Sequence, residues 1–148
     1  MIALIQRVAE AQVYIDGREK SSIGKGLLVL LGVEIGDDHQ DADYLLDKII
    51  HLRIFEDQQE KMNLSLADVS GEMMVVSQFT LLGDCRKGRR PSFVRAEQPE
   101  KAKSLYDYFI GKGRQLYGKI SSGEFQATMK IHLINDGPVT LCIHSRRH

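Results

Sequence analysis

The chain has 148 residues, of which 43% are hydrophobic and 27% are charged. That length fits one domain, and this balance is typical of a globular protein with a buried core, which argues against a disordered chain. The 20 basic and 20 acidic residues leave a formal net charge of zero, so a general electrostatic attraction to nucleic acid is excluded, and any contact with RNA requires a local basic patch.

The first part of the chain predicts three strands. Ile2–Val8 and Gln12–Ile15 are rich in β-forming residues, and the Asp16-Gly17 step after them is typical of a tight hairpin turn. Gly26–Glu34 is a dense apolar run bounded by glycines, which is typical of a strand buried on both faces. We therefore expect a sheet that begins with the first residues of the chain.

Two helices are predicted further along. Asp38 can cap a helix that begins near His39, and Pro99 suits the first turn of a second helix. Each helix has one apolar stripe at helical spacing, formed by Ala42, Leu45, Leu46, Ile49 and Ile50 in the first and by Ala102, Leu105, Tyr106, Phe109 and Ile110 in the second. One apolar face per helix predicts that both helices pack against a sheet.

The remaining strands are predicted on either side of the second helix. Glu72–Leu81 is rich in Val, Met and Phe, and a polar loop follows it over residues 82–92. Residues 125–133 alternate between apolar and polar side chains, Asn135–Pro138 is a turn signal, and the alternation resumes over Val139–Ile143. This order predicts a single β-rich α/β domain over residues 1–148, in which mixed or antiparallel sheets carry two main helices on one side.

The cysteines and the apolar runs indicate a cytoplasmic protein. Cys85 and Cys142 are the only cysteines, and their wide separation excludes a CxxC redox or zinc motif, so we interpret them as reduced thiols. The first residues lack the basic and apolar stretches of a signal peptide. The longest apolar run, Leu27–Val33, is too short to span a bilayer, so we expect no contact with membranes.

Several familiar motifs are incomplete. Gly113–Lys119 resembles a phosphate-binding loop, but it lacks a Ser or Thr at position 120 and follows a helix, so we interpret it as a helix end with a glycine stop. Ser77 does not lie in the Gly-x-Ser-x-Gly pattern of a nucleophile elbow. We expect no metal and no cofactor, because metal-ligand spacing is absent among the histidines, which are His39, His51, His132, His144 and His148.

Three segments favour a functional role over a purely structural one. Ser77–Leu81 places hydroxyl, amide and aromatic groups at the end of a buried strand, although Thr and Phe are also good strand formers. Arg86–Phe93 begins with four cations in five positions, which suit a phosphate backbone, although such runs are often solvated loops. Asn135–Thr140 contains a Gly-Pro step, which is a turn signal and also a place where a cis peptide bond can be held.

Together, these segments resemble the D-aminoacyl-tRNA deacylase family. Its pattern is matched by SQFTL, Gly-x-Arg-Pro-Ser-Phe and NDGPVT in this order. Shorter matches are Ile5–Val8, Gly26–Val33, Arg53–Phe55 and Lys61–Asn63. The resemblance runs from residue 1 to about residue 144. It leaves the tail Ser145–His148 outside the family pattern and without an assigned role.

The resemblance implies a barrel-like β core and a homodimer with its active sites at the subunit interface. It implies hydrolysis of the ester that joins a D-amino acid, or glycine mischarged on tRNA-Ala, to the 3′ acceptor end of tRNA, with L-aminoacyl substrates rejected. Four sets of residues are implied: Ser77, Gln78, Phe79 and Thr80 for catalysis; Gly137 and Pro138, as a Gly-cisPro unit acting in the partner's site, for chiral selectivity; Arg7, Asn135 and Thr140 as support; and Arg86, Lys87, Arg89 and Arg90 for tRNA binding.

The sequence is compatible with more than one role for Thr80 and for Arg7. Backbone N–H groups around Gln78, Phe79 and Thr80 can stabilise an oxyanion, and Thr80 is a candidate nucleophile. No His or Lys in the motif is placed to activate Thr80, so we favour a role in orientation, with the 2′-hydroxyl of the RNA assisting. Arg7 either braces the Gly-Pro step or is a strand-edge cation. The rivals are a different small hydrolase, which uses Ser77 or Thr80 with His132 as a base, and a non-enzymatic RNA-binding module, which uses the cations at 86–90.

Overall fold

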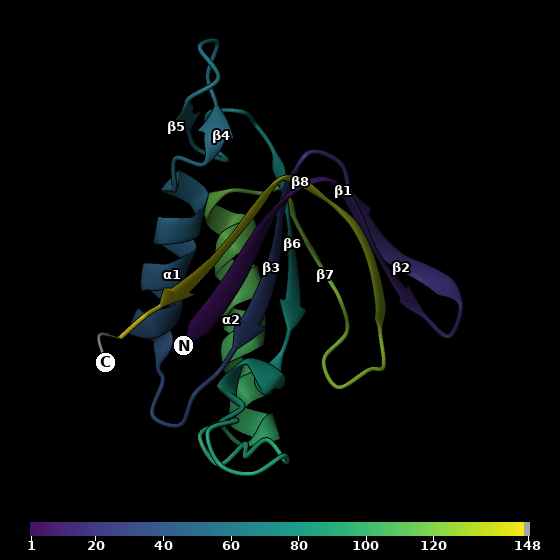
Figure 1. The fold of residues 1–148 in the computed structure, drawn as a ribbon, viewed down its shortest axis with the longest axis vertical. Coiled ribbons are helices and arrows are strands. Elements are labelled where there is room, and N and C mark those ends of the chain that lie inside the picture. Colours follow the sequence, from purple (N-terminus) through teal and green to yellow (C-terminus); the bar gives the residue numbers. More distant parts are fainter. Residues whose placement is uncertain (147–148) are drawn as a thin grey trace.

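The computed structural model describes residues 1–146 and has an α/β fold, as predicted (Figure 1). In chain order, its elements are β1 (Ile2–Ile15), β2 (Arg18–Ile23), β3 (Gly26–Gly32), α1 (His39–His51), β4 (Phe55–Glu56), β5 (Met62–Leu64), β6 (Glu72–Ser77), the 3-10 helix η1 (Phe79–Leu82), α2 (Pro99–Leu116), β7 (Ile120–Ser122) and β8 (Lys130–His144).

The main sheet is mixed and curls into a nearly closed barrel. Its strand order is β2-β1-β3-β6-β7, and β8 pairs with β1. β1 is antiparallel to β2, β3 and β8, whereas the β3–β6 and β6–β7 pairs are parallel. The Ser21 hydroxyl on β2 donates a 2.9 Å hydrogen bond to the carbonyl of Ser122 on β7. This contact joins the two ends of the strand order, which confirms the barrel-like core.

The central strands separate two apolar clusters. Side chains alternate in direction along a strand, so Leu27 and Val29 face one side of β3 while Leu28 faces the other. Both helices pack on the first side, together with Met73 and Val75 of β6. The second side is filled from β1, β2 and β6, with partly buried residues of β8 packed against it. The prediction that both helices pack on one side of the sheet is confirmed.

Local signals place the ends of both helices. The Asp38 carboxylate accepts hydrogen bonds from the backbone N–H groups of Gln40 and Asp41, and the Asp41 side chain accepts from the Asp38 N–H, which completes a capping box. α2 begins at Pro99 and ends at Leu116, followed by Gly118 at a φ of +95°. The interpretation of Gly113–Lys119 as a helix end with a glycine stop is therefore confirmed.

Three strand boundaries differ from the prediction. β1 is one strand over Ile2–Ile15 rather than two, because β8 pairs along both halves of it. β6 ends at Ser77, since the chain turns into η1 and leaves the sheet. The alternating residues 125–129 are not a strand; they join β7 to β8 through a turn, with Gln126 at a φ of +63°, and β8 begins only at residue 130.

The turn predicted at Asn135–Pro138 is a bulge within β8. Val8 pairs with Asn135 and Gln6 pairs with Thr140, so residues 136–139 of β8 lie opposite Arg7 alone. Both flanks pair antiparallel with the same strand, β1, so the chain keeps its direction across the Gly-Pro step instead of reversing. The extra residues project from the strand at this point.

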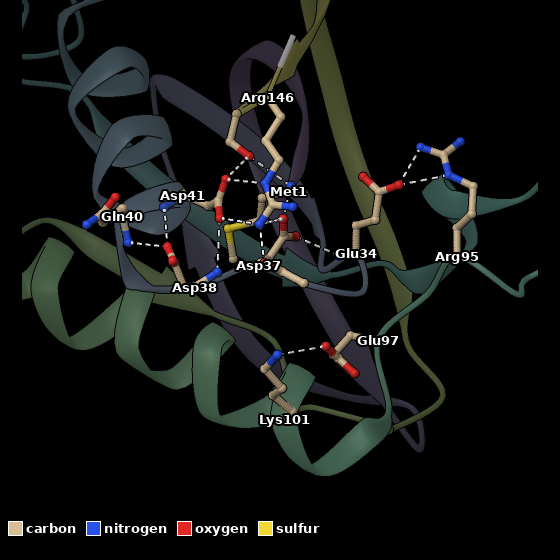
Figure 2. A network of polar contacts seen from close by, with 12 residues as sticks. Met1, Glu34, Asp37, Asp38, Gln40, Asp41, Arg95, Glu97, Lys101 and Arg146 are labelled. Carbon is tan, nitrogen blue, oxygen red and sulfur yellow. Dashed lines mark hydrogen bonds and ion pairs between the residues drawn. The ribbon is translucent and has the colours of Figure 1, made fainter. Parts of the chain in front are cut away.

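The first two residues of the tail, to which the sequence assigned no role, take part in a polar network with the start of the chain and α1. The Met1 ammonium donates to Asp37 at 2.7 Å and to the Ser145 hydroxyl at 2.8 Å (Figure 2). Ser145 and Arg146 in turn donate to Asp41 at the start of α1, at 2.7 Å and 3.0 Å. Burial raises the pKa of Asp41, but hydrogen bonds from Arg146 and Ser145 outweigh this and lower it well below its usual range. Residues 147–148 lie outside the described residues.

Candidate active site

A pocket of about 650 Å³ opens beside the carboxyl end of β6. Its walls come from β6, the start of η1, the loop before α2, the beginning of α2 and the connection from β7 to β8. The lining is mostly apolar, with a few polar groups from Ser77, Gln78, Glu97 and Gln126. A concave, largely apolar site with few polar groups is typical of a small-molecule or cofactor pocket.

The predicted catalytic segment forms one edge of this pocket. Ser77, Gln78 and Phe79 line it, whereas Thr80 is exposed and lies outside the lining. Phe79 is 57% exposed and meets Phe93 edge to face, with 5.2 Å between ring centroids. Two aromatic rings at the entrance suit a flat ring of a ligand.

The backbone of this segment provides fewer free donors than expected. The N–H of Gln78 donates a 2.8 Å hydrogen bond to the carbonyl of Leu31, so it is not available for an oxyanion. Phe79 and Thr80 are the first residues of a 3-10 helix, in which the first N–H groups have no acceptor within the helix. Of the three backbone N–H groups expected to stabilise an oxyanion, those of Phe79 and Thr80 remain candidates.

No general base lies next to Thr80 among the described residues. The hydroxyl of Thr80 accepts a hydrogen bond from the side-chain amide of Gln78, which cannot remove a proton at neutral pH. His132 is a poor base for this pocket: its neighbour Ile131 lines the pocket, and successive side chains of a strand point to opposite faces. His132 lies instead against the ring of Tyr14, at 4.9 Å between centroids.

The Gly137-Pro138 peptide bond is cis, as the resemblance implied, and the bulge around it is held at two points. Asn135 spans the bulge from inside: its side chain accepts from the Val139 N–H at 3.1 Å and donates to the Thr140 hydroxyl at 2.8 Å. Arg7, which is 6% exposed, holds it from β1 by donating to the Asp136 carbonyl at 3.0 Å. Arg7 thus braces the Gly-Pro step and is not a free strand-edge cation.

Within one chain, the structure does not bring the Gly-Pro step to the pocket. Arg7, opposite the bulge, pairs with Leu27, which pairs with Met73 at the start of β6. Ser77 is four residues further along β6, which is about 13 Å along the strand at about 3.3 Å per residue. Across the sheet, three strand spacings separate β8 from β6, which adds a distance of about 14 Å in the perpendicular direction. Figure 1 shows the middle of β8 at one end of the sheet and η1 at the other.

The basic segment is a loop closed at its base. The backbones of Asp84 and Ser92 exchange two hydrogen bonds, of 2.8 Å and 2.9 Å. The Asp84 carboxylate accepts from the Arg86 side chain and backbone, and these bonds lower its pKa well below the usual range. Within residues 1–146, Arg86 is thus paired inside the loop, while no ion pair occupies the other three cations, Lys87, Arg89 and Arg90.

Glu97 was not predicted as a site residue, although it lines the pocket. The backbone N–H of Gln98 and then the ammonium of Lys101 lower the pKa of Glu97, so it remains ionised. Figure 2 shows the Glu97–Lys101 pair beside the beginning of α2. A single Glu before a predicted helix gives no signal in the sequence, because it resembles an ordinary residue of a first helical turn.

The comparisons with known proteins identify the family. The model described as D-Tyr-tRNA(Tyr) deacylase matches residues 4–144. The chain therefore belongs to the D-aminoacyl-tRNA deacylase family, whose members are hydrolases of carboxylic ester bonds. It is 58% identical to the D-aminoacyl-tRNA deacylase of Syntrophus aciditrophicus (strain SB), with 99% of each chain covered. It is 52% identical to that of Clostridioides difficile (strain 630), again with 99% of each covered.

Two solved structures have the same fold. The structure titled c-Myc DNA Unwinding Element Binding Protein matches with a TM-score of 0.95 and 39% identity, over 99% of this chain and 100% of that one. A probable eukaryotic D-amino acid tRNA deacylase matches with a TM-score of 0.82 over 96% of this chain and 97% of that one; at 16% identity this shows the fold alone.

Among residues 1–146, none of the helices combines the length and apolar character needed to cross a bilayer. The same residues contain no cluster of three or more His, Cys, Asp or Glu side chains that could hold a metal ion.

Proposed function

We propose that this chain hydrolyses the ester of D-aminoacyl-tRNA and of glycyl-tRNA-Ala, and that it rejects L-aminoacyl-tRNA. The observation that carries the proposal is the pocket edged by Ser77, Gln78 and Phe79, in a chain whose relatives are named D-aminoacyl-tRNA deacylases. The volume of about 650 Å³ suits the terminal nucleoside of the acceptor end together with its aminoacyl group.

The chemistry needs positioning more than a strong nucleophile. The oxygen of a water molecule attacks the ester carbonyl carbon, and the bond from that carbon to the ribose 3′ oxygen breaks. The attacking water loses a proton, and the 3′ oxygen gains one to become a hydroxyl. The neighbouring 2′-hydroxyl is the nearest group that can relay this proton. The N–H groups of Phe79 and Thr80 would donate to the oxyanion that forms during attack, which is the part of the reaction where fixed donors contribute most.

The selectivity requires a second copy of the chain. Gly137 and Pro138 lie too far from Ser77 to act on the pocket of their own chain, so we place them in the partner's pocket. β8 supports this arrangement, because its only pairing within residues 1–146 is with β1 and its other edge is open. Ile134 and Leu141 on this strand are 54% and 40% exposed. An open strand edge with exposed apolar side chains suits pairing with another chain.

The experiment that tests the proposal compares substrates that differ only in the amino acid. The protein is incubated separately with D-tyrosyl-, L-tyrosyl- and glycyl-tRNA, and release of the amino acid is measured under single-turnover conditions. We expect rapid loss of the D-tyrosyl and glycyl groups, because a pocket that excludes an L side chain has nothing to exclude in glycine. Equal rates for D- and L-tyrosyl-tRNA, or binding without release, would contradict the proposal.

Thr80→Ala separates orientation from covalent catalysis. Because no base adjoins its hydroxyl, we expect the single-turnover rate on D-tyrosyl-tRNA to fall less than about tenfold, as for a lost hydrogen bond. Removal of a covalent nucleophile would instead cost on the order of 10⁴-fold or more. A loss of that size in a variant with unchanged circular dichroism would show that Thr80 is the nucleophile.

The basic loop predicts the salt dependence of tRNA binding. Each phosphate contact contributes roughly 0.7–0.9 to the slope of log affinity against log salt. Replacing Lys87, Arg89 and Arg90 together with Ala should lower the slope by about 2–3, since these cations are free to bind phosphate. Fluorescence titration with tRNA at several salt concentrations measures it. Lys103→Ala, on an exposed face of α2, is the control, and a slope unchanged in the triple variant would show that the loop does not touch tRNA.

A further inference from the structure

The hairpin formed by β4 and β5, together with the two residues before it, has no role in the site described above. It contains both short motifs, Arg53–Phe55 and Lys61–Asn63. Figure 1 shows it standing above the end of α1, at the same end of the molecule as the middle of β8. It contributes nothing to the pocket lining. Its position suggests a role at the Gly-Pro step instead.

Arg7 connects this hairpin to the Gly-Pro bulge. One guanidinium nitrogen donates to the Asp136 carbonyl at 3.0 Å, and another donates to the Ile54 carbonyl at 2.8 Å. The third lies 3.7 Å from the Glu56 carboxylate, and a Cβ atom on Gly137 would lie 3.1 Å from it. A planar guanidinium with donors in fixed directions can hold two carbonyls at a set separation. The position of the bulge therefore depends on the position of Ile54.

The base of the hairpin is fixed in the core. Ile54 is 5% exposed and Phe55 is 1% exposed, and both belong to the cluster beneath the helices. A closely packed core resists displacement, so the Ile54 carbonyl is a firm anchor for Arg7.

The outer part of the hairpin is held by its own side chains. Asn63 is central: its carbonyl and its side chain accept hydrogen bonds from Arg53 at 2.8 Å and 3.2 Å, and its side-chain amide donates to Asp57 at 2.8 Å. Asp57 also accepts from the backbone N–H groups of Gln59 and Lys61. Asn63 therefore ties both strands of the hairpin to the residue before Ile54.

We propose that this hairpin is the outer support of the Gly137–Pro138 step, and that Asn63 and Glu56 are positioning residues for substrate selectivity that act through Arg7. The selectivity readout rests on the proposed function; the support itself does not. The Ile54 carbonyl at the base of the hairpin fixes the Arg7 guanidinium, and the guanidinium in turn fixes the Asp136 carbonyl in the bulge. The position of the bulge relative to β1 is set by these two hydrogen bonds.

The test uses the full chain, with Asn63→Ala and Arg7→Lys alone and together. Lys keeps the charge but cannot reach both carbonyls with a planar fork. Each single variant should raise the L-tyrosyl rate relative to the D-tyrosyl rate by roughly 2- to 30-fold, the usual size of such coupling. The double variant should show no further increase, because both act on one contact. Additive effects would overturn the proposal, and so would an unchanged ratio in Asn63→Ala.

A second readout is independent of catalysis. The Val139 N–H, which donates to Asn135 inside the bulge, should exchange with deuterium several-fold faster in Asn63→Ala than in the unaltered chain, as measured by NMR. Glu56→Gln, which keeps the shape of the side chain, should give a smaller change in the same direction.

The matched control is Lys103→Ala, which breaks an exposed ion pair on α2. Unchanged Val139 exchange in Asn63→Ala, or an equal change in Lys103→Ala, would overturn the proposal. A chain that fails to discriminate D from L would contradict the proposed function but leave this measurement valid.

Discussion

Gly137→Ala is expected to lower the single-turnover rate on D-aminoacyl-tRNA by about 100-fold or more while the chain stays folded. Gly137 has a φ of +134°, a backbone conformation that residues with a side chain rarely adopt. A Cβ atom there would lie 2.8 Å from a methyl carbon of Val139 and 3.0 Å from its backbone nitrogen. The bulge must shift to relieve these contacts, and a displacement of about 1 Å in a positioning group costs about 10²-fold in rate.

The matched control is another glycine to alanine substitution. Gly111 lies within α2, and a Cβ atom added there meets nothing within 4 Å. Gly111→Ala should leave the rate unchanged and stabilise the helix slightly. Both variants are compared by circular dichroism, melting temperature and rate. A folded Gly137→Ala variant with the rate and the L-to-D ratio of the unaltered chain would show that the bulge takes no part in the reaction.

Asp37→Ala should have the largest effect on stability. The Asp37 carboxylate and the Met1 ammonium form an ion pair at 2.7 Å in which both side chains are fully buried. Asp37 also accepts a 2.7 Å hydrogen bond from the Glu34 N–H. Removing one partner leaves the other charge buried and unpaired, which costs about 3–5 kcal/mol. For a chain of this size that corresponds to a fall of roughly 6–20 °C in the melting temperature.

The neighbouring Asp38 provides the comparison. It caps α1 from an exposed position, and the loss of a helix cap costs about 1 kcal/mol. Thermal unfolding of Asp37→Ala and Asp38→Ala is followed by circular dichroism in the same buffer. Equal melting temperatures for the two variants would show that the buried ion pair contributes no more than an ordinary helix cap.

The helices could be predicted from sequence because their signals are local. Asp38 and Pro99 mark the helix starts, and each apolar stripe repeats within one element. β8 could not be predicted in this way. Asn135–Pro138 has the composition of a turn, but its flanks pair with the same strand, and that pairing depends on residues more than 120 positions away. Residues 125–129 alternate like a strand, yet no neighbouring strand pairs with them.

The candidate site was predictable only in part, for a related reason. Ser77, Gln78 and Phe79 follow one another in the sequence, so their motif is visible, and they line one pocket. The contact of Arg7 with Asp136 was expected only from the family resemblance, since nothing in a lone arginine indicates its partner. The pairing of Arg86 with Asp84 reduces four predicted phosphate-binding cations to three free ones. Charge runs in a sequence do not show which members are already neutralised.

The buried ammonium of Met1 makes the fold sensitive to the chemistry of its amino group. An acyl group on that nitrogen would replace a charged donor with a neutral amide beside the Asp37 carboxylate. Ser145 and Arg146 converge on the same place, so the loss would reach the strand that carries the Gly-Pro step. Both ends of the described chain therefore depend on one charged nitrogen to close on the start of α1.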